Sequence, residues 1–355
     1  MGDTRAGRLA EVLERRGLDS LLVSNLVNVR WLTGFTGTNG AAVVTRDRRL
    51  FLTDFRYTEQ AEAQVDAAFE RLPAGRDLVG DLASQLTGRA GFDDGHMSVA
   101  THRKLQDKVA DGVELVAAGG AVEELREVKD DEELTRIAAA QELASAALER
   151  ILERGLVGRT ERAVALDLEQ EMRQAGATGP SFPSIVASGP HGALPHAVPR
   201  EGEIAAGQLV VLDWGALLDG YCSDCTRTVA TGPLEDEAFE AYELVKRAQQ
   251  TGLEAVRAGV ACKAVDAAAR DVIADAGFGD EFGHSLGHGV GLEVHEGPTL
   301  SMRSEGDLAG GNVVSVEPGV YLPGKFGIRI EDLVAVTETG ADVFTRLSKD
   351  LLTVD

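Results

Sequence analysis

Short apolar runs alternate with amphipathic segments over the first 120 residues. The apolar runs have the length of strands and cover residues 21–23, 42–44 and 50–52. Between and after them, apolar residues recur at the spacing of a helix face, over residues 57–69, 76–87 and 99–110. This alternation predicts a small α/β domain at the amino-terminal end.

A charged stretch at residues 123–131 leads into a long helical pattern rich in Ala and Leu. Asp130 or Asp131 is the expected N-cap of that helix. We therefore predict an amino-terminal domain of residues 1–122, a linker of 123–133 and a second domain of 134–355. A chain of 355 residues is long enough for two domains that each bury a core.

The second domain repeats one order of elements: two helices, a loop with a histidine, and a hairpin with two acids. The first set comprises helices at about 132–154 and 160–175, His196, Asp213 and Asp224; the second comprises helices at about 235–258 and 262–276, His288, Glu317 and Glu331. We expect an α+β domain with an internal pseudo-twofold duplication. Two such halves facing each other would bring both acidic hairpins to one cleft.

The turn of the first hairpin fixes its register. Asp219-Gly220 between apolar flanks is a strong signal for a two-residue turn, because both positions favour positive φ. This turn places Asp213 opposite Thr226, so Asp213 and Asp224 become diagonal neighbours on one face. Their Cα atoms would lie about 7–8 Å apart, within reach of a shared ion.

The second hairpin follows the same logic with a longer loop. A three-residue loop at 323–325 places Glu317 directly opposite Glu331. Pro318 is the weak point of this prediction, because a proline in a strand can force a bulge and shift the pairing by one. Each register also sets a glycine among the acids, Gly215 in the first hairpin and Gly319 in the second, and we expect both to leave room for an ion.

Divalent cations explain why apolar runs would carry four acids. Buried carboxylates without partners would repel one another or stay protonated, whereas two divalent cations balance four of them. Ion pairs with Arg227 and Arg329 are the alternative, but two arginines cannot neutralise four acids. Carboxylate oxygens with an imidazole favour Mn²⁺ or Co²⁺, and Zn²⁺ remains possible. A water between two such ions becomes a hydroxide near neutral pH and can attack a carbonyl.

Composition narrows the partners of this chain. A net charge of −23 argues against nucleic acid, which needs clustered Lys and Arg. The chain has no run of eighteen apolar residues and no basic, apolar leader, so we expect neither a membrane span nor export. Three cysteines are too few for a disulfide framework, and Cys222 and Cys225 are read as structural. A cytoplasmic location is the resulting expectation.

A glycine-rich stretch between the hairpins contains His284, His288 and His295 in the sequence GHSLGHGVGLEVHE. Together with LDWG, YCSDCTRT, VEPGVY, IRIED and SFPSIVASG, it resembles the pita-bread dinuclear metallopeptidases that include aminopeptidase P and prolidase. The segments TGFTGTNG and LFLTDFRYTEQA resemble the amino-terminal domain that these enzymes share with creatinase. The resemblance spans essentially the whole chain and implies both a fold and a site.

The resemblance implies five metal ligands, namely Asp213, Asp224, His288, Glu317 and Glu331. By position, Asp224 and Glu331 would bridge two ions, and Glu317 would also move the proton of the attacking water. Three histidines match substrate-contacting positions of the family, and Arg329 matches an arginine that supports the site; the histidines are His196, His284 and His295. His191 matches no family position and is read as ordinary loop.

The implied reaction is hydrolysis of the bond between an amino-terminal residue and a following proline, in short proline-containing peptides. Many prolidase-like members carry an arginine after the His-Glu-x-Pro motif, where this chain has Thr299 with Arg303 nearby. We therefore expect an Xaa-Pro aminopeptidase of the aminopeptidase P type, with Xaa-Pro dipeptidase as the alternative. A non-catalytic peptide-binding module is the remote alternative. Similar proteins are usually homodimers, so we expect a homodimer.

Overall fold

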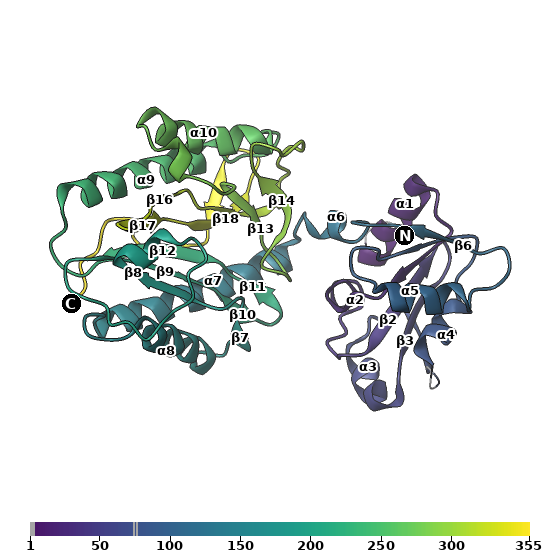
Figure 1. Ribbon diagram of the computed structural model, residues 1–355. Coiled ribbons are helices and arrows are strands. Elements are labelled where there is room, and N and C mark those ends of the chain that lie inside the picture. Colours follow the sequence, from purple (N-terminus) through teal and green to yellow (C-terminus); the bar gives the residue numbers. More distant parts are fainter. Residues whose placement is uncertain (1–3, 74, 76) are drawn as a thin grey trace. The chain divides into compact units, whose positions relative to one another are not determined.

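The computed structural model describes residues 4–73, 75 and 77–355 of the chain. The chain divides into two compact units, Met1–Arg126 and Glu127–Asp355 (Figure 1). Within the described part of the chain, no helix combines the length and the apolar character needed to cross a membrane.

A mixed sheet with the strand order β4-β3-β2-β1-β5-β6 forms the centre of the amino-terminal unit. β1 pairs antiparallel with β2 and parallel with β5. The strands are β1 (Ser20–Val23), β2 (Gly40–Thr45), β3 (Arg49–Thr53), β4 (Glu70–Pro73), β5 (Arg89–Phe92) and β6 (Glu114–Ala117). The three predicted apolar runs lie in β1, β2 and β3, so the prediction of an α/β domain is confirmed.

The helices of this unit are shorter than the periodicity predicts. They are α1 (Arg5–Arg16), α2 (Leu26–Thr33), the 3₁₀ turn η1 (Phe55–Tyr57), α3 (Thr58–Gln64), α4 (Leu78–Ala83), α5 (Val99–Gln106) and α6 (Glu123–Arg126). The helix expected over 57–69 ends at Gln64 because Val65 turns to an extended conformation. Residue 76, in the segment expected to be helical over 76–87, lies outside the described residues.

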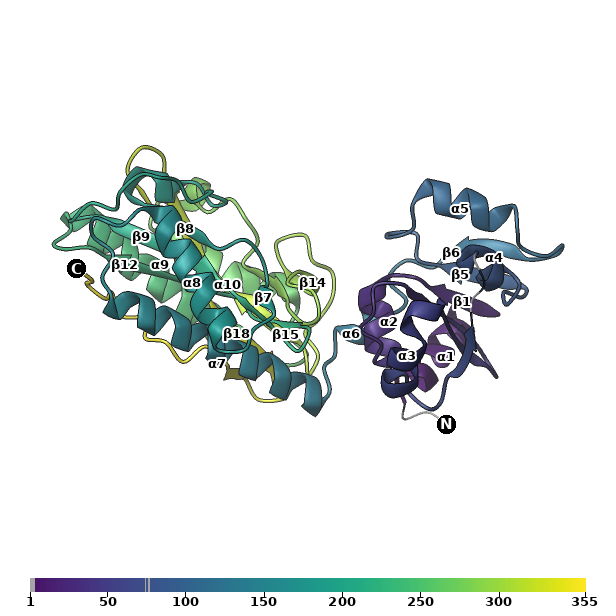
Figure 2. The ribbon, with the colours of Figure 1, turned by 90° about the horizontal axis from the view of Figure 1, so that it is seen from below.

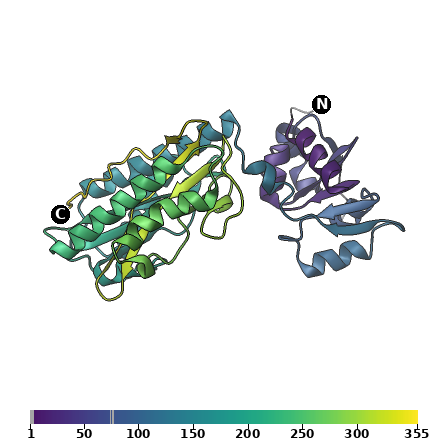
Figure 3. The same ribbon diagram turned by 90° about the horizontal axis from the view of Figure 1, so that it is seen from above.

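Two helix pairs frame the second unit: α7 (Asp131–Glu153) with α8 (Glu161–Gln174), and α9 (Asp236–Ala255) with α10 (Cys262–Asp275). Asp130 caps α7 in a capping box, because its side chain accepts from Glu133 N while the Glu133 side chain accepts from Asp130 N. All four helices agree with the predicted ranges to within about three residues. Figure 2, seen from below, has α7 and α8 in front of the strands, and Figure 3, seen from above, has α9 and α10 there.

The strands repeat as the helices do. One sheet has the order β12-β9-β8, and the other contains the matching order β18-β15-β13, flanked by β14 and β19. The strands of the first set are β8 (Ile185–Ser188), β9 (Leu209–Trp214) and β12 (Cys225–Ala230); those of the second are β13 (Gly287–Gly289), β15 (Val313–Val316) and β18 (Asp332–Val336), with β14 (Glu296–Leu300) and β19 (Ala341–Val343). Each half has a buried apolar cluster of its own, which includes Leu168 and Trp214 in one and Val265 and Val316 in the other. The predicted internal duplication is thus present.

Both hairpins have the predicted register. Asp219 and Gly220 have φ values of 47° and 80°, as the two-residue turn requires, and Asp213 pairs with Thr226. In the second hairpin Gly319 pairs with Arg329, so the loop is 323–325 and Pro318 does not shift the pairing. Short strands and turns complete the unit: β7 (Gly179–Pro180), η2 (Gly189–Ala193), β10 (Ala216–Leu218), β11 (Tyr221–Cys222), η3 (Gly279–Glu281), β16 (Gly319–Leu322) and β17 (Phe326–Arg329).

Candidate metal centre and active site

Three carboxylates meet where the two hairpins face each other. Asp213 lies near the end of β9, Asp224 directly precedes β12, and Glu331 lies between β17 and β18. Each is buried, and each offers an oxygen within 4.8 Å of the oxygens of the other two. Two sequence-distant hairpins therefore converge on one buried acidic cluster.

His288 and Glu317 extend this cluster. His288 Nε2 lies 3.3 Å from Glu317 Oε1 and 3.5 Å from Asp224 Oδ2. Glu317 follows β15, and its backbone N–H donates to Leu286 O, which holds the histidine strand beside it. The structure thus brings all five predicted ligands into one continuous group.

Like charges lie close together among these carboxylates. Burial raises the pKa of Asp224 well above its ordinary value, and the neighbouring charges of Glu331 and Asp213 raise it further. Burial likewise raises the pKa of Glu331 well above its ordinary value, with Glu317 and Asp213 adding to the effect. A site that favours protonated acids when empty of cations is one that a divalent cation would relieve.

His288 is oriented to offer a lone pair to this group. Its Nδ1 lies 3.0 Å from Gly289 O, and because a carbonyl only accepts, Nδ1 carries the hydrogen. In the neutral ring, Nε2 is then the free ligand atom, a pattern usual in metal-binding histidines. Burial lowers the pKa of His288, but the hydrogen bond and charge of Glu317 outweigh it and raise that pKa to about 9. A metal ion would replace the proton on Nε2.

The two oxygens of Glu331 differ in their hydrogen bonding, and this difference shows whether the cluster suits a cation. Glu331 Oε2 accepts a hydrogen bond from Thr226 Oγ1 at 2.8 Å, whereas Glu331 Oε1 is buried and has no hydrogen-bond partner among the described residues. An orphaned carboxylate oxygen is costly in a protein interior. The buried oxygens with one oriented imidazole nitrogen fit a hard or borderline divalent cation.

Among the described residues, arginine forms a direct ion pair with only one of the four acids. Arg329 Nη2 donates to Asp213 Oδ2 at 2.5 Å, and Arg329 Nε donates to Thr226 Oγ1 at 3.0 Å. Burial raises the pKa of Asp213, and Arg329 offsets part of that rise. Arg227 instead donates to Asp332 Oδ1 at 2.8 Å, and Asp332 is not one of the four acids. The alternative in which both arginines balance the acids therefore fails.

His284 lies next to Arg329 through a shared tyrosine. Arg329 Nη1 donates to Tyr321 Oη at 2.7 Å, and His284 Nε2 lies 3.0 Å from the same oxygen. His284 Nδ1 lies 2.8 Å from Ser285 O and must be the donor there. Burial lowers the pKa of His284, so its ring is neutral and Nε2 accepts from the Tyr321 hydroxyl.

The other two predicted histidines lie around His288. The His295 ring packs edge-on against His288 with 4.4 Å between the centroids. Burial lowers the pKa of His295, and the charge of His288 lowers it further. Pro195 O, next to His196 in the chain, accepts from Arg329 Nη1 at 3.3 Å, so the loop that carries His196 reaches the same group. His196 itself is exposed. All the predicted site residues therefore surround one centre.

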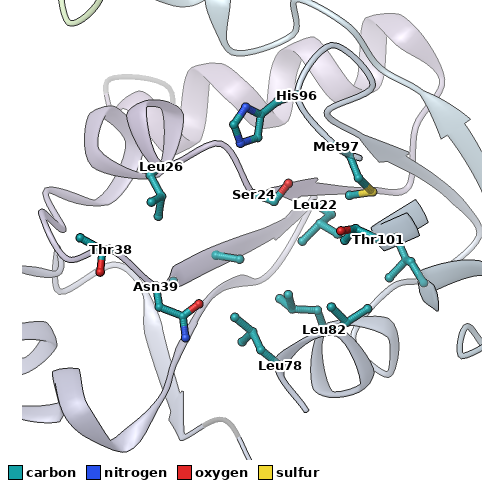
Figure 4. Close-up of a pocket in the computed structure, with 14 residues that line it drawn as sticks. Leu22, Ser24, Leu26, Thr38, Asn39, Leu78, Leu82, His96, Met97 and Thr101 are labelled. Carbon is teal, nitrogen blue, oxygen red and sulfur yellow. The ribbon is translucent and has the colours of Figure 1, made fainter. Parts of the chain in front are cut away.

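Outside this centre, the amino-terminal unit has a cavity of about 240 Å³ (Figure 4). Its lining is mainly aliphatic, with Ser24, Thr38, Asn39, His96 and Thr101 as the polar members. Its described lining contains no carboxylate, so it does not offer the oxygen-rich set found in the second unit.

Comparison with known proteins agrees with this geometry. Residues 135–338 match metallopeptidase family M24, and residues 5–128 match the creatinase/prolidase N-terminal domain. The chain belongs to metallopeptidase family M24. The resemblance inferred from the sequence, the fold of a creatinase-like domain followed by a pita-bread domain, and the class of metallo-exopeptidase are all confirmed.

Three relatives of this M24 peptidase cover nearly its whole length. It is similar to the Xaa-Pro dipeptidase from Bacillus anthracis, with 39% identity, 99% of both chains covered and a TM-score of 0.96. The Xaa-Pro dipeptidase of Pyrococcus furiosus is 34% identical over 98% of this chain and 99% of its own. The X-Pro aminopeptidase from Thermotoga maritima MSB8 is 35% identical, covers 99% of this chain and 100% of its own, and has a TM-score of 0.90.

Three residues of this M24 site were missed by the sequence reasoning. Thr226 donates to Glu331, Ser315 Oγ donates to Glu317 Oε1 at 3.1 Å, and Tyr321 links His284 to Arg329. The two-residue period of a strand could have identified them. Thr226 lies two positions after Asp224, Ser315 lies two positions before Glu317, and Tyr321 lies four positions after Glu317. Residues at even spacing share the face of a predicted ligand.

The predicted role of the two glycines was wrong. A Cβ on Gly215 would lie 2.0 Å from Ser223 O and 2.1 Å from Ser181 Oγ, and one on Gly319 would lie 2.7 Å from Tyr321 Oη. Both glycines therefore make room for neighbouring protein atoms and not for an ion. His191 is also more than ordinary loop, because its Nδ1 lies 2.8 Å from the buried Glu161 Oε2.

Proposed function

We propose that this protein is a metal-dependent Xaa-Pro dipeptidase. The observation that carries the proposal is the convergence of Asp213, Asp224, His288, Glu317 and Glu331, in a chain that matches Xaa-Pro dipeptidases over nearly their full length. The relatives favour this alternative over the aminopeptidase P type expected from the sequence. The similarity to the Thermotoga maritima enzyme keeps Xaa-Pro aminopeptidase as the second candidate.

In this proposal Asp213, Asp224, His288, Glu317 and Glu331 would hold two divalent ions, with Mn²⁺ as the proposed metal. When bound, such ions supply the positive charge that activates a water nucleophile and polarises the scissile carbonyl. Burial raises the pKa of Glu317, but His288 outweighs it, so that pKa lies below its ordinary value. Glu317 is therefore a carboxylate at neutral pH, able to take a proton and return it to the leaving nitrogen.

The predicted histidines differ in whether their ring nitrogens already have hydrogen-bond partners within the protein. Both nitrogens of His284 are engaged, one with Ser285 O and one with Tyr321, so we assign it to orienting the tyrosine. His196 and His295 are the proposed contacts to the peptide and to the oxyanion that forms during hydrolysis. The homodimer and the cytoplasmic location expected from the sequence stay predictions, which gel filtration and cell fractionation would test.

Substrate length separates the two candidate functions. Hydrolysis of Ala-Pro, Ala-Pro-Ala and longer Xaa-Pro peptides should be compared with Mn²⁺, Co²⁺ and Zn²⁺. We expect Ala-Pro to be cleaved and the longer peptides to be poor substrates. Efficient cleavage of Ala-Pro-Ala with little cleavage of Ala-Pro would establish the aminopeptidase instead. Chelation should abolish activity and added Mn²⁺ should restore it; full activity after verified metal removal would refute both.

A further inference from the structure

Two fully buried carboxylates lie on corresponding helices of the two halves, outside the group of five proposed metal ligands (the metal group). Glu161 is the first residue of α8, Asp266 lies within α10, and both are 0% exposed. A buried carboxylate is tolerated only when hydrogen bonds or ion pairs surround it. The groups that surround these two are therefore informative.

Glu161 binds both ends of the loop that carries His196. Its Oε1 accepts from Ser188 N and Ser188 Oγ, each at 2.9 Å. Its Oε2 lies 2.8 Å from His191 Nδ1 and accepts from Arg200 N at 3.3 Å. One side chain thus ties residues 188 and 200 together, with His196 between them.

The other side of this loop rests on β17. Pro195 O accepts from Arg329 Nη1 at 3.3 Å. A Cβ added to Gly327 would lie 1.9 Å from Gly192 O, so the two backbones touch there. The loop is consequently fixed between Glu161 and β17 at residues on both sides of the exposed His196.

Asp266 holds the segment around His284 in a similar way. It accepts from Leu286 N at 3.0 Å and forms a two-pronged pair with Arg270, with both distances 2.8 Å. Arg270 in turn donates to Phe282 O at 2.8 Å and to His284 O at 2.7 Å. The Arg270 guanidinium also lies 4.1 Å from the centre of the Phe282 ring. The backbone on both sides of His284 is therefore anchored to α10.

We propose that Glu161 and Asp266 are positioning residues, each of which fixes the active-site histidine segment of its own half. The assignment of their effect on catalysis rests on the proposed function. Both carboxylates order a segment before substrate binds, and a displacement of about 1 Å at a reacting group can cost on the order of a hundredfold in rate. Because a carboxylate only accepts, an amide in its place would turn an N–H group toward the donors that it holds.

The test begins with Glu161→Gln and Asp266→Asn in the metal-loaded protein. We expect kcat/KM for Ala-Pro to fall by roughly ten- to a hundredfold while metal content stays at the wild-type level. Glu169→Gln on α8 and Asp271→Asn on α10 are matched controls: Glu169 accepts from Ser184 N, outside the loop, and Asp271 is exposed. If Glu161→Gln or Asp266→Asn were as active as its control, the assignment of that residue would be overturned.

Crossed double-mutant cycles separate positioning from a general loss of structure. If Glu161 acts through His196, Glu161→Gln should cost little further activity once His196 is alanine, and it should keep its full cost once His284 is alanine. Asp266→Asn should show the reverse dependence. Costs that are the same in both histidine backgrounds would mean that the carboxylates merely support the fold.

Amide hydrogen exchange gives a readout that does not depend on activity. Exchange should rise over 188–200 in Glu161→Gln and over 282–286 in Asp266→Asn, each without a change in the other segment. If Glu161→Gln does not fold, His191→Ala can replace it, because it removes one hydrogen-bond partner of Glu161 from the loop. Amide exchange over 188–200 should then rise as well, by a smaller amount. If the wild-type protein has no activity but the variants show these exchange changes, the proposed function is refuted and the positioning role of Glu161 and Asp266 stands. If the wild-type protein is active but the variants show no such changes, the positioning role is refuted and the proposed function stands.

Discussion

At the scale of single residues, three of the five proposed metal ligands have a polar neighbour two positions away along the chain. Thr226 accompanies Asp224, Ser315 accompanies Glu317, and Arg329 accompanies Glu331. Ser315 Oγ, for example, donates to Glu317 and also accepts from His288 N at 3.1 Å. Ser315 thus orients the proposed ligand of its own segment, whereas Thr226 and Arg329 reach the other hairpin and donate to Glu331 Oε2 and Asp213 Oδ2.

Glu331 should illustrate a conflict between function and stability. Glu331→Gln removes a carboxylate whose pKa is raised by burial and by two neighbouring acids, so it should stabilise the chelated protein at pH 8. We expect a gain of about 1 kcal/mol, or roughly 3 °C in the melting temperature, together with loss of metal binding and activity. Calorimetry in chelator would measure it, with the exposed Glu305→Gln as control. A lower melting temperature than wild type would contradict the argument.

The metal-free site should make stability depend on pH. Asp224, Glu331 and His288 all have raised pKa values in the folded chain, the last at about 9. Groups of this kind stabilise the fold below their unfolded pKa and lose that contribution as pH rises through the folded value. Chelated protein should therefore lose on the order of 2 kcal/mol between pH 6.5 and 9.

Metal-loaded protein should show the opposite trend, because protons compete with the ion for the same atoms. Thermal melts with chelator and with added metal, taken from pH 6.5 to 9, would measure the gap between the two curves. A chelated protein whose stability is flat or rising over this window would be inconsistent with the raised pKa values.

At the scale of elements, hairpin registers were predictable and loop positions were not. Asp219-Gly220 and the loop at 323–325 determine pairing locally, so sequence alone located all four acids. The loop that carries His196 owes its place to Glu161 and to β17, which are distant in sequence. No local pattern contains those partners. The same holds for α2 and β4–β6, whose short segments show too little periodicity to predict them.

The contact between the His196 loop and β17 should be sensitive to a single methyl group. Gly327→Ala would place a Cβ 1.9 Å from Gly192 O, so the loop must move away. We expect at least a tenfold loss of kcat/KM, with metal content unchanged because the loop carries none of the five proposed ligands. Gly340→Ala, where a Cβ would meet nothing within 4 Å, is the matched control and should retain wild-type activity.

At the scale of the whole molecule, the metal group belongs entirely to the second unit. All five proposed ligands and the hydrogen-bond partners described for them lie within Glu127–Asp355, which contains the two apolar clusters of its duplicated halves. The amino-terminal unit has its own sheet and its own core, which includes Leu22, Val43 and Leu52. Each unit therefore has the internal packing of a separate domain.

A fragment of residues 127–355 should fold and bind metal without the amino-terminal unit. Calorimetric titration with Mn²⁺ should give the stoichiometry of the full chain and an affinity within about tenfold of it. Asp224→Asn in the same fragment is the control for specific binding. A fragment that is folded by circular dichroism yet does not bind Mn²⁺ would show that the first unit completes the centre.

The two halves of the second unit are joined at the metal group itself. Glu331 N donates to Thr226 O, and Thr228 Oγ1 donates to Arg329 O at 2.9 Å. Thr226 and Glu331 are 105 residues apart in sequence, so forming these contacts requires the closure of a long loop, which is intrinsically slow. Metal therefore has no assembled site to bind until the halves have docked. We therefore expect metal binding to lower the unfolding rate and to leave the refolding rate unchanged, so that the ion stabilises the protein only after it has folded.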